Sequence, residues 1–187
     1  LNTYYSGKTY GDIWGFETER YFEESDFTGQ NEDGSWNYKQ GIADQSGLEG
    51  DNFHYGPGDI KFKDLNGDKK IDGGKGTADD HGDLKVIGNS MPRYEYSFHI
   101  GGAWKGIDLD MYFQGVGKWD QWSYGAFVMP FSRGADGIYA NQMDYWTEDN
   151  PDAFYPRLYP GSGTSGTVSG VGKGAYNFYP QSRYLVD

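Results

Sequence analysis

The sequence predicts an all-β chain: antiparallel strands of a partial transmembrane β-barrel, with long extracellular loops and at most one short helix. Three features of the 187 residues support this prediction. Segment 93–117 alternates between apolar and polar residues, and long polar stretches flank it. Aromatic residues make up 18% of the chain and all hydrophobic residues only 36%, so aliphatic residues are too few for a large core. Strand side chains point alternately to opposite faces, so alternation predicts a sheet with one apolar and one polar face.

The region before the alternating segment contains two strand-like runs and two loops. Residues 1–27 include GDIWGFETERYF, a strand-like run that an acidic turn follows. Residues 28–56 are polar and rich in glycine, which predicts a loop. Gly58 to Lys63 (GDIKFK) is predicted to form a short strand, and residues 64–83 an acidic, glycine-rich loop.

Two alternating strands joined by a short turn are predicted between Arg93 and Gly117. Their shared apolar face is formed by Tyr94, Tyr96, Phe98, Ile100, Ile107, Leu109, Met111 and Phe113. Each strand is about ten residues long, the length that a tilted strand needs to cross the hydrocarbon of a bilayer. A soluble sheet packed on a core would give the same alternation. Charges along the whole polar face favour the water-filled interior of a barrel.

The region after the alternating segment is predicted to hold one short helix, over residues 136–146. Asp136 is a typical N-cap residue, and Tyr139, Met143 and Trp146 repeat at helical spacing. Residues 147–181 contain four of the seven prolines and a Gly/Ser/Thr run from Gly161 to Gly174, which together predict a loop. The closing segment, 182–187, has the composition of a strand that begins there.

These elements suit a barrel with short turns on one side of the membrane and long loops on the other. The turn Trp104-Lys105-Gly106 is then expected to be periplasmic, and segments 28–92 and 118–181 extracellular. The sequence contains no run of about 18 apolar residues, so no transmembrane helix is predicted. We expect residues 1–187 to be a fragment of a larger barrel protein. The alternative is a complete small secreted domain.

Charge and composition limit the classes of partner. The formal net charge of −12 argues against a nucleic-acid partner. The absence of cysteine excludes a disulfide scaffold and a thiolate metal site. The 17 tyrosines and 6 tryptophans favour surfaces that are apolar at one end and wet at the other, such as membrane interfaces, sugar-binding sites and protein interfaces.

The acidic loop contains a possible calcium site. Oxygen-bearing side chains occupy positions 1, 3, 5 and 9 of an EF-hand-type loop, and the expected ligands are Asp64, Asn66, Asp68, Asp72 and the backbone carbonyl of Lys70. Calcium takes six to eight oxygen ligands, which alternate residues of a tight loop can supply. Lys69 and Lys75 depart from the glycine and the closing acid of the pattern. Asp79, Asp80 or Asp83 could close the site; otherwise the loop is a solvated turn without an ion.

Aromatic side chains are the candidate ligand-binding residues. Trp119, Trp122 and Tyr124 lie in the segment WDQWSY, and Tyr145 and Trp146 lie in a second loop. Their rings could stack on sugars, pack within the loops or belong to an aromatic girdle. No HExxH, GxSxG or Walker pattern is present, and adjacent acids are expected by chance in a chain with 28 of them. We therefore expect binding without enzymatic activity.

Four ordered stretches resemble the C-terminal part of SusC/RagA-like TonB-dependent outer-membrane transporters of Bacteroidetes. They are Pro57 to Asp72 (PGDIKFKDLNGDKKID), Ile87 to Tyr94 (IGNSMPRY), Gly106 to Lys118 (GIDLDMYFQGVGK) and Tyr145 to Leu158 (YWTEDNPDAFYPRL). Gly11 to Phe22 and Gln181 to Leu185 also look like segments of that family. The residues around 73–83 depart from the family's tighter calcium-like loop.

The resemblance implies a 22-stranded outer-membrane barrel of a Gram-negative bacterium, closed by an N-terminal plug that lies outside this chain. It implies uptake of glycans or peptides, energy supplied through TonB, contact with membrane lipid and a SusD-like surface lipoprotein as partner. It does not name the substrate, because extracellular loops vary with the cargo. The alternative from another class is a soluble extracellular, calcium-dependent carbohydrate-binding or adhesion module, which leaves the strand length unexplained.

Overall fold

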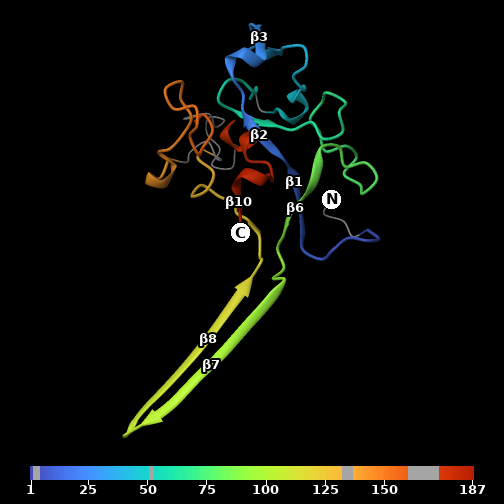
Figure 1. The fold of residues 1–187 in the computed structure, drawn as a ribbon. Coiled ribbons are helices and arrows are strands. Elements are labelled where there is room, and N and C mark those ends of the chain that lie inside the picture. Colours follow the sequence, from blue (N-terminus) through green and yellow to red (C-terminus); the bar gives the residue numbers. More distant parts are fainter. Residues whose placement is uncertain (2–4, 51–52, 132–136, 160–172) are drawn as a thin grey trace, which may run out of the picture.

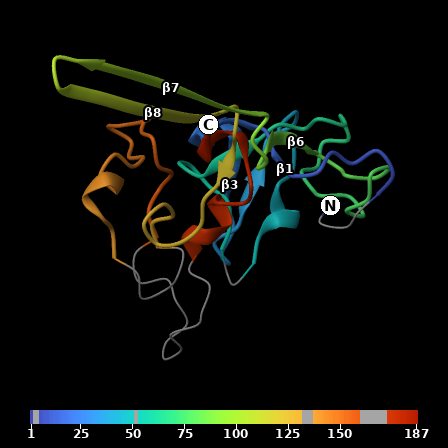
Figure 2. The same cartoon turned by 90° about the horizontal axis from the view of Figure 1, so that it is seen from below.

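The computed structural model describes residues 1, 5–50, 53–131, 137–159 and 173–187. These residues form an all-β structure with two parts, which Figure 1 shows clearly. A long two-stranded arm (residues 94–117) projects from a head that contains the rest of the described chain. Figure 2, seen from below, shows the arm foreshortened along one side of the head. The predicted all-β fold class is thus confirmed.

All strand pairs in the described residues are antiparallel and two-stranded. The arm pairs β7 (Tyr94–Trp104) with β8 (Ile107–Gly117). The head pairs β1 (Asp12–Phe16) with β6 (Leu84–Asn89), β2 (Thr18–Tyr21) with β5 (Ile60–Phe62), β3 (Phe27–Gln30) with β4 (Trp36–Tyr38), and β9 (Gln121–Trp122) with β10 (Leu185–Val186). Short 3-10 helices are Glu24–Asp26, Ser46–Leu48, Ala140–Gln142, Lys173–Asn177 and Ser182–Tyr184.

The arm continues into the head through backbone hydrogen bonds. Arg93 N donates to the Lys118 carbonyl at 3.3 Å, and Asp120 N donates to the Asn89 carbonyl at 3.0 Å. β6 leads into β7, and β8 leads into β9. Because β1 flanks β6 and β10 flanks β9, the chain forms an antiparallel meander in the order β1, β6–β7, β8–β9, β10.

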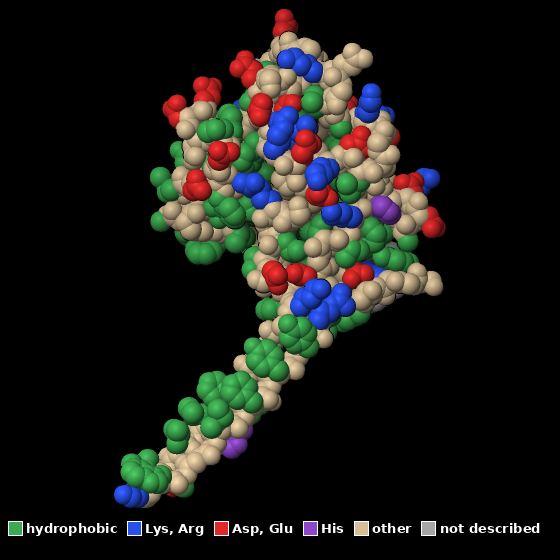
Figure 3. Space-filling view, in the orientation of Figure 1, with side chains coloured by type: hydrophobic (Ala, Val, Ile, Leu, Met, Phe, Trp, Pro, Cys, Tyr) green, Lys and Arg blue, Asp and Glu red, His purple; other side chains and the backbone are tan. Residues whose placement is uncertain are grey.

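The register of the arm places the alternating residues as predicted. Phe98 lies opposite Phe113, with ring centroids 4.6 Å apart, and Ile100 lies opposite Met111. The two-residue turn, Lys105 and Gly106, has φ of 49° and 83°, because a tight hairpin turn of this kind needs positive φ at both positions. Figure 3 shows apolar side chains gathered along the length of the arm.

None of the described residues outside the arm covers this apolar face. The exposed fractions are 54% for Tyr96, 49% for Phe98, 55% for Leu109 and 42% for Phe113. The apolar side of segment 93–117 therefore does not lie inside the described head.

The head is held by small aromatic clusters. Phe16 stacks on Phe62 at 4.8 Å, and Phe22, Phe27, Phe53 and Tyr55 form a second buried cluster. Burial of such rings removes large apolar areas from water and supplies most of the driving force for folding.

In the head, a polar side chain makes hydrogen bonds to a strand backbone that a neighbouring strand would otherwise make. Buried Gln45 donates from Nε2 to the Ile60 carbonyl at 2.9 Å and accepts from Phe62 N at 3.0 Å, so it pairs with β5 as a strand residue would. This satisfies backbone groups that would be costly to bury unpaired.

The segment predicted as a loop, 28–56, contains β4 and all of β3 except Phe27, a hairpin that the sequence pattern did not indicate. Of the strand predicted over 182–187, only Leu185–Val186 (β10) is a strand, and Ser182–Tyr184 form a 3-10 turn. Of the predicted Gly161 to Gly174 loop, residues 161–172 lie outside the described residues. Within the described ranges, no helix has the length and apolarity needed to cross a bilayer.

The predicted helix over 136–146 is wrong for the described part of that segment, where only the 3-10 turn Ala140–Gln142 is present. Backbone partners outside the segment replace helical ones: Trp146 N donates to the Tyr155 carbonyl at 2.9 Å. Buried Gln142 accepts from Tyr139 N at 3.0 Å and donates to the Ala126 carbonyl at 2.7 Å. These tertiary bonds outweigh the helical spacing of the apolar residues.

Candidate functional site

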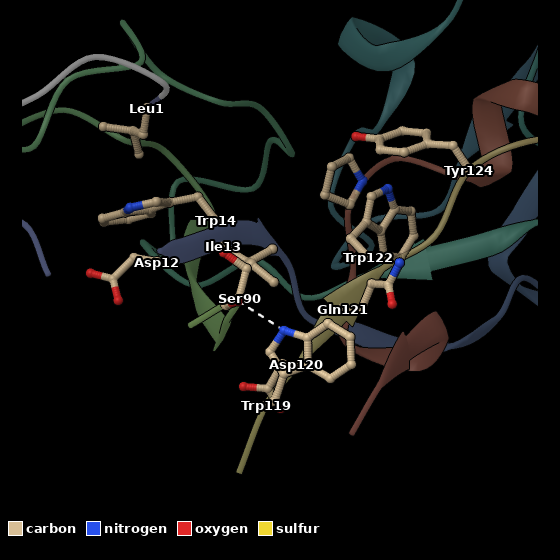
Figure 4. Close-up of a pocket in the computed structure, with 11 residues that line it drawn as sticks. Leu1, Asp12, Ile13, Trp14, Ser90, Trp119, Asp120, Gln121, Trp122 and Tyr124 are labelled. Carbon is tan, nitrogen blue, oxygen red and sulfur yellow. Dashed lines mark hydrogen bonds between the residues drawn. The ribbon is translucent and has the colours of Figure 1, made fainter. Parts of the chain in front are cut away.

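An open cleft of about 480 Å³ lies between β1 and β9, beside the point where the arm joins the head. We call it the aromatic cleft. Its lining residues are Leu1, Asp12, Ile13, Trp14, Ser90, Trp119, Asp120, Gln121, Trp122, Tyr124 and Pro180. In Figure 4, Trp14 lies on one side of the cleft, Trp122 and Tyr124 lie on the other, and Trp119 lies along the lower edge.

The meander of strands positions these rings. β1 brings Trp14 to the cleft, and the pairing of β9 with β10 holds Trp122, whose ring meets Tyr124 edge to face at 6.0 Å. Trp119 Nε1 donates to the Ser90 carbonyl at 2.8 Å, which fixes its ring against the strand before the arm. The aromatic walls are thus attached to regular structure, although Tyr124 itself is largely exposed.

Two carboxylates line the cleft and share one buried partner. Asn89 Nδ2 donates to Asp12 Oδ1 at 2.8 Å, and Asn89 N donates to Asp120 Oδ2 at 2.7 Å. Thr9 N also donates to Asp12, at 3.1 Å. Among the described residues, Asp120 Oδ1 has no hydrogen-bond donor in reach, so it can still accept from a bound hydroxyl group.

Two indole groups at the cleft have unused donors. Trp14 Nε1 and Trp122 Nε1 are buried and have no hydrogen-bond acceptor in the described part of the chain. Leaving such a group unpaired costs about 1–3 kcal/mol.

The structure brings together Trp119, Trp122 and Tyr124, three of the predicted ligand-binding residues. Tyr145 and Trp146 instead line a second, mainly apolar cavity of about 480 Å³ with Arg157 and Leu158.

Trp146 has a packing role in the head. A Cβ built on Gly58, where φ is +89°, would lie 2.3 Å from the Trp146 ring, so the ring covers a position that only glycine can occupy.

Asp12, Trp14 and Asp120 are residues of the aromatic cleft that the sequence pattern did not indicate. Trp14 lies in the strand-like run GDIWGF, but nothing in the local pattern says that this strand lies beside residues more than 100 positions later. The missing information is the meander, which brings β1 and β9 to either side of β6 and the segment that follows it.

In the acidic loop, side-chain oxygens hold the backbone in a series of tight turns. Asp64 accepts from Gly67 N at 2.6 Å and from Lys69 N at 2.9 Å, and Asp68 accepts from Lys70 N at 2.8 Å. Asn66 accepts from Asp68 N at 2.9 Å.

Asp83 closes the acidic loop from inside. It is buried and accepts from Leu65 N at 2.7 Å and from Asp72 N at 3.0 Å. No group of three carboxylates or imidazoles in the described residues is arranged to share a metal ion. This finding does not count Asn66 or backbone carbonyls, so calcium binding by Asp64, Asn66, Asp68, Lys70 and Asp72 stays a prediction.

A buried carboxylate, Asp59, joins two loops of the head. It accepts from Tyr159 Oη at 2.6 Å, from Asn177 Nδ2 at 2.7 Å and from Gly56 N at 2.9 Å, and Arg157 lies 3.9 Å away. Burial raises the pKa of Asp59 to about 6, and the nearby Arg157 opposes this shift. Asp59 therefore connects the turn before β5 with the second cavity.

Glu17 has the opposite environment. Hydrogen bonds from Lys63 and Lys85 lower its pKa to about 2, and their positive charges act in the same direction. This ion pair joins β5 and β6 to the link between β1 and β2 at the surface of the head.

No family model matches the chain. The sequence is 30% identical over 141 residues to TonB-dependent receptor P26 of Formosa agariphila. The alignment covers 75% of this chain, which spans only 13% of that receptor. The chain is thus similar to a limited part of a TonB-dependent receptor.

Proposed function

We propose that the chain is part of an outer-membrane TonB-dependent transporter of the SusC/RagA type, which takes up glycans or other large nutrients. The uncovered apolar face of the arm is the observation that carries this proposal. The sequence similarity of the chain to a TonB-dependent receptor supports the same class of protein.

The dimensions of the arm suit a membrane. Each strand has 11 residues, which at a rise of about 3.3–3.4 Å per residue gives a length of roughly 37 Å. A strand tilted by about 40° then spans roughly 28 Å, close to the thickness of the hydrocarbon core. The apolar face would meet lipid, and the polar face, with Glu95, His99 and Asp110, would line a hydrated interior.

The two free edges of the arm support the same arrangement. β7 and β8 pair only with each other among the described residues, so one edge of each strand has unpaired backbone groups. Such groups are too costly to leave unpaired in lipid, and a closed barrel pairs them all. Neighbouring strands of the proposed barrel would cover both edges.

The head then corresponds to the extracellular end of the barrel. Its loops would contact an oligosaccharide or peptide and a SusD-like surface lipoprotein, and TonB would act through parts of the protein outside this chain. The chain itself would bind and transport without catalysis. The acidic loop would hold a calcium ion of modest affinity, as sites in extracellular modules do.

Fractionation of the native bacterium tests the proposal. The protein should sediment with the outer membrane, need detergent for extraction, and migrate differently on electrophoresis before and after boiling, as folded barrels do. Nutrient uptake should stop when TonB is deleted. Release in soluble form without detergent would contradict the proposal and favour the soluble calcium-dependent binding module.

A further inference from the structure

We propose that the aromatic cleft binds one or two sugar rings of an uncharged oligosaccharide and that Asp12 and Asp120 discriminate against acidic sugars. This inference rests on the proposed transport function and adds the substrate class.

The rings provide the surface on which a sugar binds. Trp14 faces the cleft from one side and Trp122 with Tyr124 from the other, and Trp119 closes the lower edge (Figure 4). Aromatic faces carry partial negative charge and pack well against the C–H groups of a pyranose ring. The volume of about 480 Å³ lies within the range of small-molecule sites.

The carboxylates provide acceptors for hydroxyl groups. An ionised carboxylate can only accept hydrogen bonds, and Asp120 Oδ1 has none from the described residues. Hydrogen bonds to a charged acceptor are stronger than those between neutral groups. A ligand rich in O–H donors satisfies this oxygen.

The same carboxylates oppose an anionic ligand. The side chains that line the cleft include Asp12 and Asp120 but no lysine, arginine or histidine. A uronate or sulfate group placed between the rings would lie close to these two negative charges. The ammonium group of Lys8 lies at the edge of the cleft, where it donates to the Leu1 carbonyl at 3.0 Å, but it does not line the space between the rings. In an open, partly hydrated cleft this repulsion should weaken binding by about tenfold at low ionic strength and less at high ionic strength.

Binding measurements on the full-length protein in detergent test this inference. The probes are cellohexaose and maltohexaose as neutral ligands and hexagalacturonate as an acidic ligand of equal ring number, each titrated by calorimetry. We expect at least one neutral probe to bind, and to bind about tenfold more tightly than hexagalacturonate. Trp122→Ala should weaken neutral binding by at least tenfold.

A charge variant isolates the selectivity. Asp12→Asn combined with Asp120→Asn keeps oxygen acceptors for Asn89 but removes both charges, so it should bring the affinity for hexagalacturonate close to that for the neutral probe. Asp149→Asn, an exposed change of the same charge away from the cleft, is the control and should leave the ratio unchanged.

Three results would overturn the inference: no binding of either neutral probe, equal or tighter binding of hexagalacturonate, or an unchanged affinity ratio in the charge variant. The proposed transport function is judged separately. A protein that resides in the outer membrane and takes up an acidic oligosaccharide in a TonB-dependent manner keeps that function and contradicts only the neutral-sugar inference.

Discussion

The arm and the head bury aromatic residues in opposite ways. In the head, Phe22 is 0% exposed within a cluster of rings, whereas Phe98 in the arm is 49% exposed although it stacks on Phe113. The head therefore buries its aromatic rings among its own residues, whereas the apolar face of the arm is left uncovered by the described chain. We propose that lipid covers this face and that neighbouring strands pair with the edges of the arm.

The largest expected effect is the difference between two variants, one with an aromatic ring truncated in the head and one with a ring truncated in the arm. Phe22→Ala should lower the free energy of unfolding of the head by about 3–5 kcal/mol, because it leaves a cavity in a closed cluster. Phe98→Ala should change the unfolding of the head by well under 1 kcal/mol, because the arm does not pack on the head clusters. Urea unfolding followed by near-ultraviolet circular dichroism measures both. Equal effects would contradict the division into two independent parts.

The next effect distinguishes the two faces of the arm. Phe98→Arg places a charge on the proposed lipid face and should destabilise the protein in phospholipid vesicles by about 2–4 kcal/mol. Ser97→Arg, one residue away on the polar face, is the matched control and should cost much less. The measurement is reversible unfolding in vesicles. Similar costs for the two variants would mean that neither face meets lipid.

A third effect concerns the buried Asp59 of the head. Burial raises the pKa of Asp59 from 3.8 to about 6. The folded state therefore binds a proton at Asp59 more tightly than the unfolded state does. The stabilisation is complete below the unfolded pKa and is lost as pH rises from about 4 to 6, by roughly 2–3 kcal/mol. Asp59→Asn should remove this dependence, as measured by unfolding at a series of pH values. A variant with the same pH profile as the parent chain would show that Asp59 is not the group responsible.

The smallest effect tests the acidic loop. If the loop binds calcium with a dissociation constant of about 1 mM, then 10 mM calcium should stabilise the head by about 1.4 kcal/mol. Magnesium at the same concentration is the ion control, and Asp64→Asn should reduce the calcium effect. Thermal unfolding with and without each ion provides the measurement. No difference between calcium and chelator would leave the loop as a turn held by its own hydrogen bonds.

The same contrast explains how much of the structure the sequence predicted. The period-two alternation of residues 94–117 is a local property, so both strands and their shared face were predicted correctly. The turn was predicted one residue too long, because Trp104 pairs with Ile107 as part of β7. The head depends on contacts between distant residues. Gln45 makes hydrogen bonds to the backbone of β5, and Asn177 donates to Asp59 although the two are far apart in the sequence. No pattern of neighbouring residues in the sequence indicates either contact.

The candidate site depends on local and on distant contacts. Trp119, Trp122 and Tyr124 are neighbours in the sequence and line one cleft, and ligand binding by them stays a prediction. Trp14 joins them only through the meander of strands. The helix predicted over 136–146 failed because helical spacing competed with bonds from Trp146 to Tyr155 and from Gln142 to Ala126.

The most direct test of the account measures which face of the arm touches lipid. The chain has no cysteine, so single changes such as Ser97→Cys, Phe98→Cys, Tyr112→Cys and Phe113→Cys give unique sites for spin labels. In vesicles, labels at 98 and 113 should be accessible to oxygen, which concentrates in lipid, and labels at 97 and 112 to a water-soluble nickel complex. Accessibility that does not alternate between adjacent residues, or labels at 98 and 113 shielded from both reagents, would contradict the account.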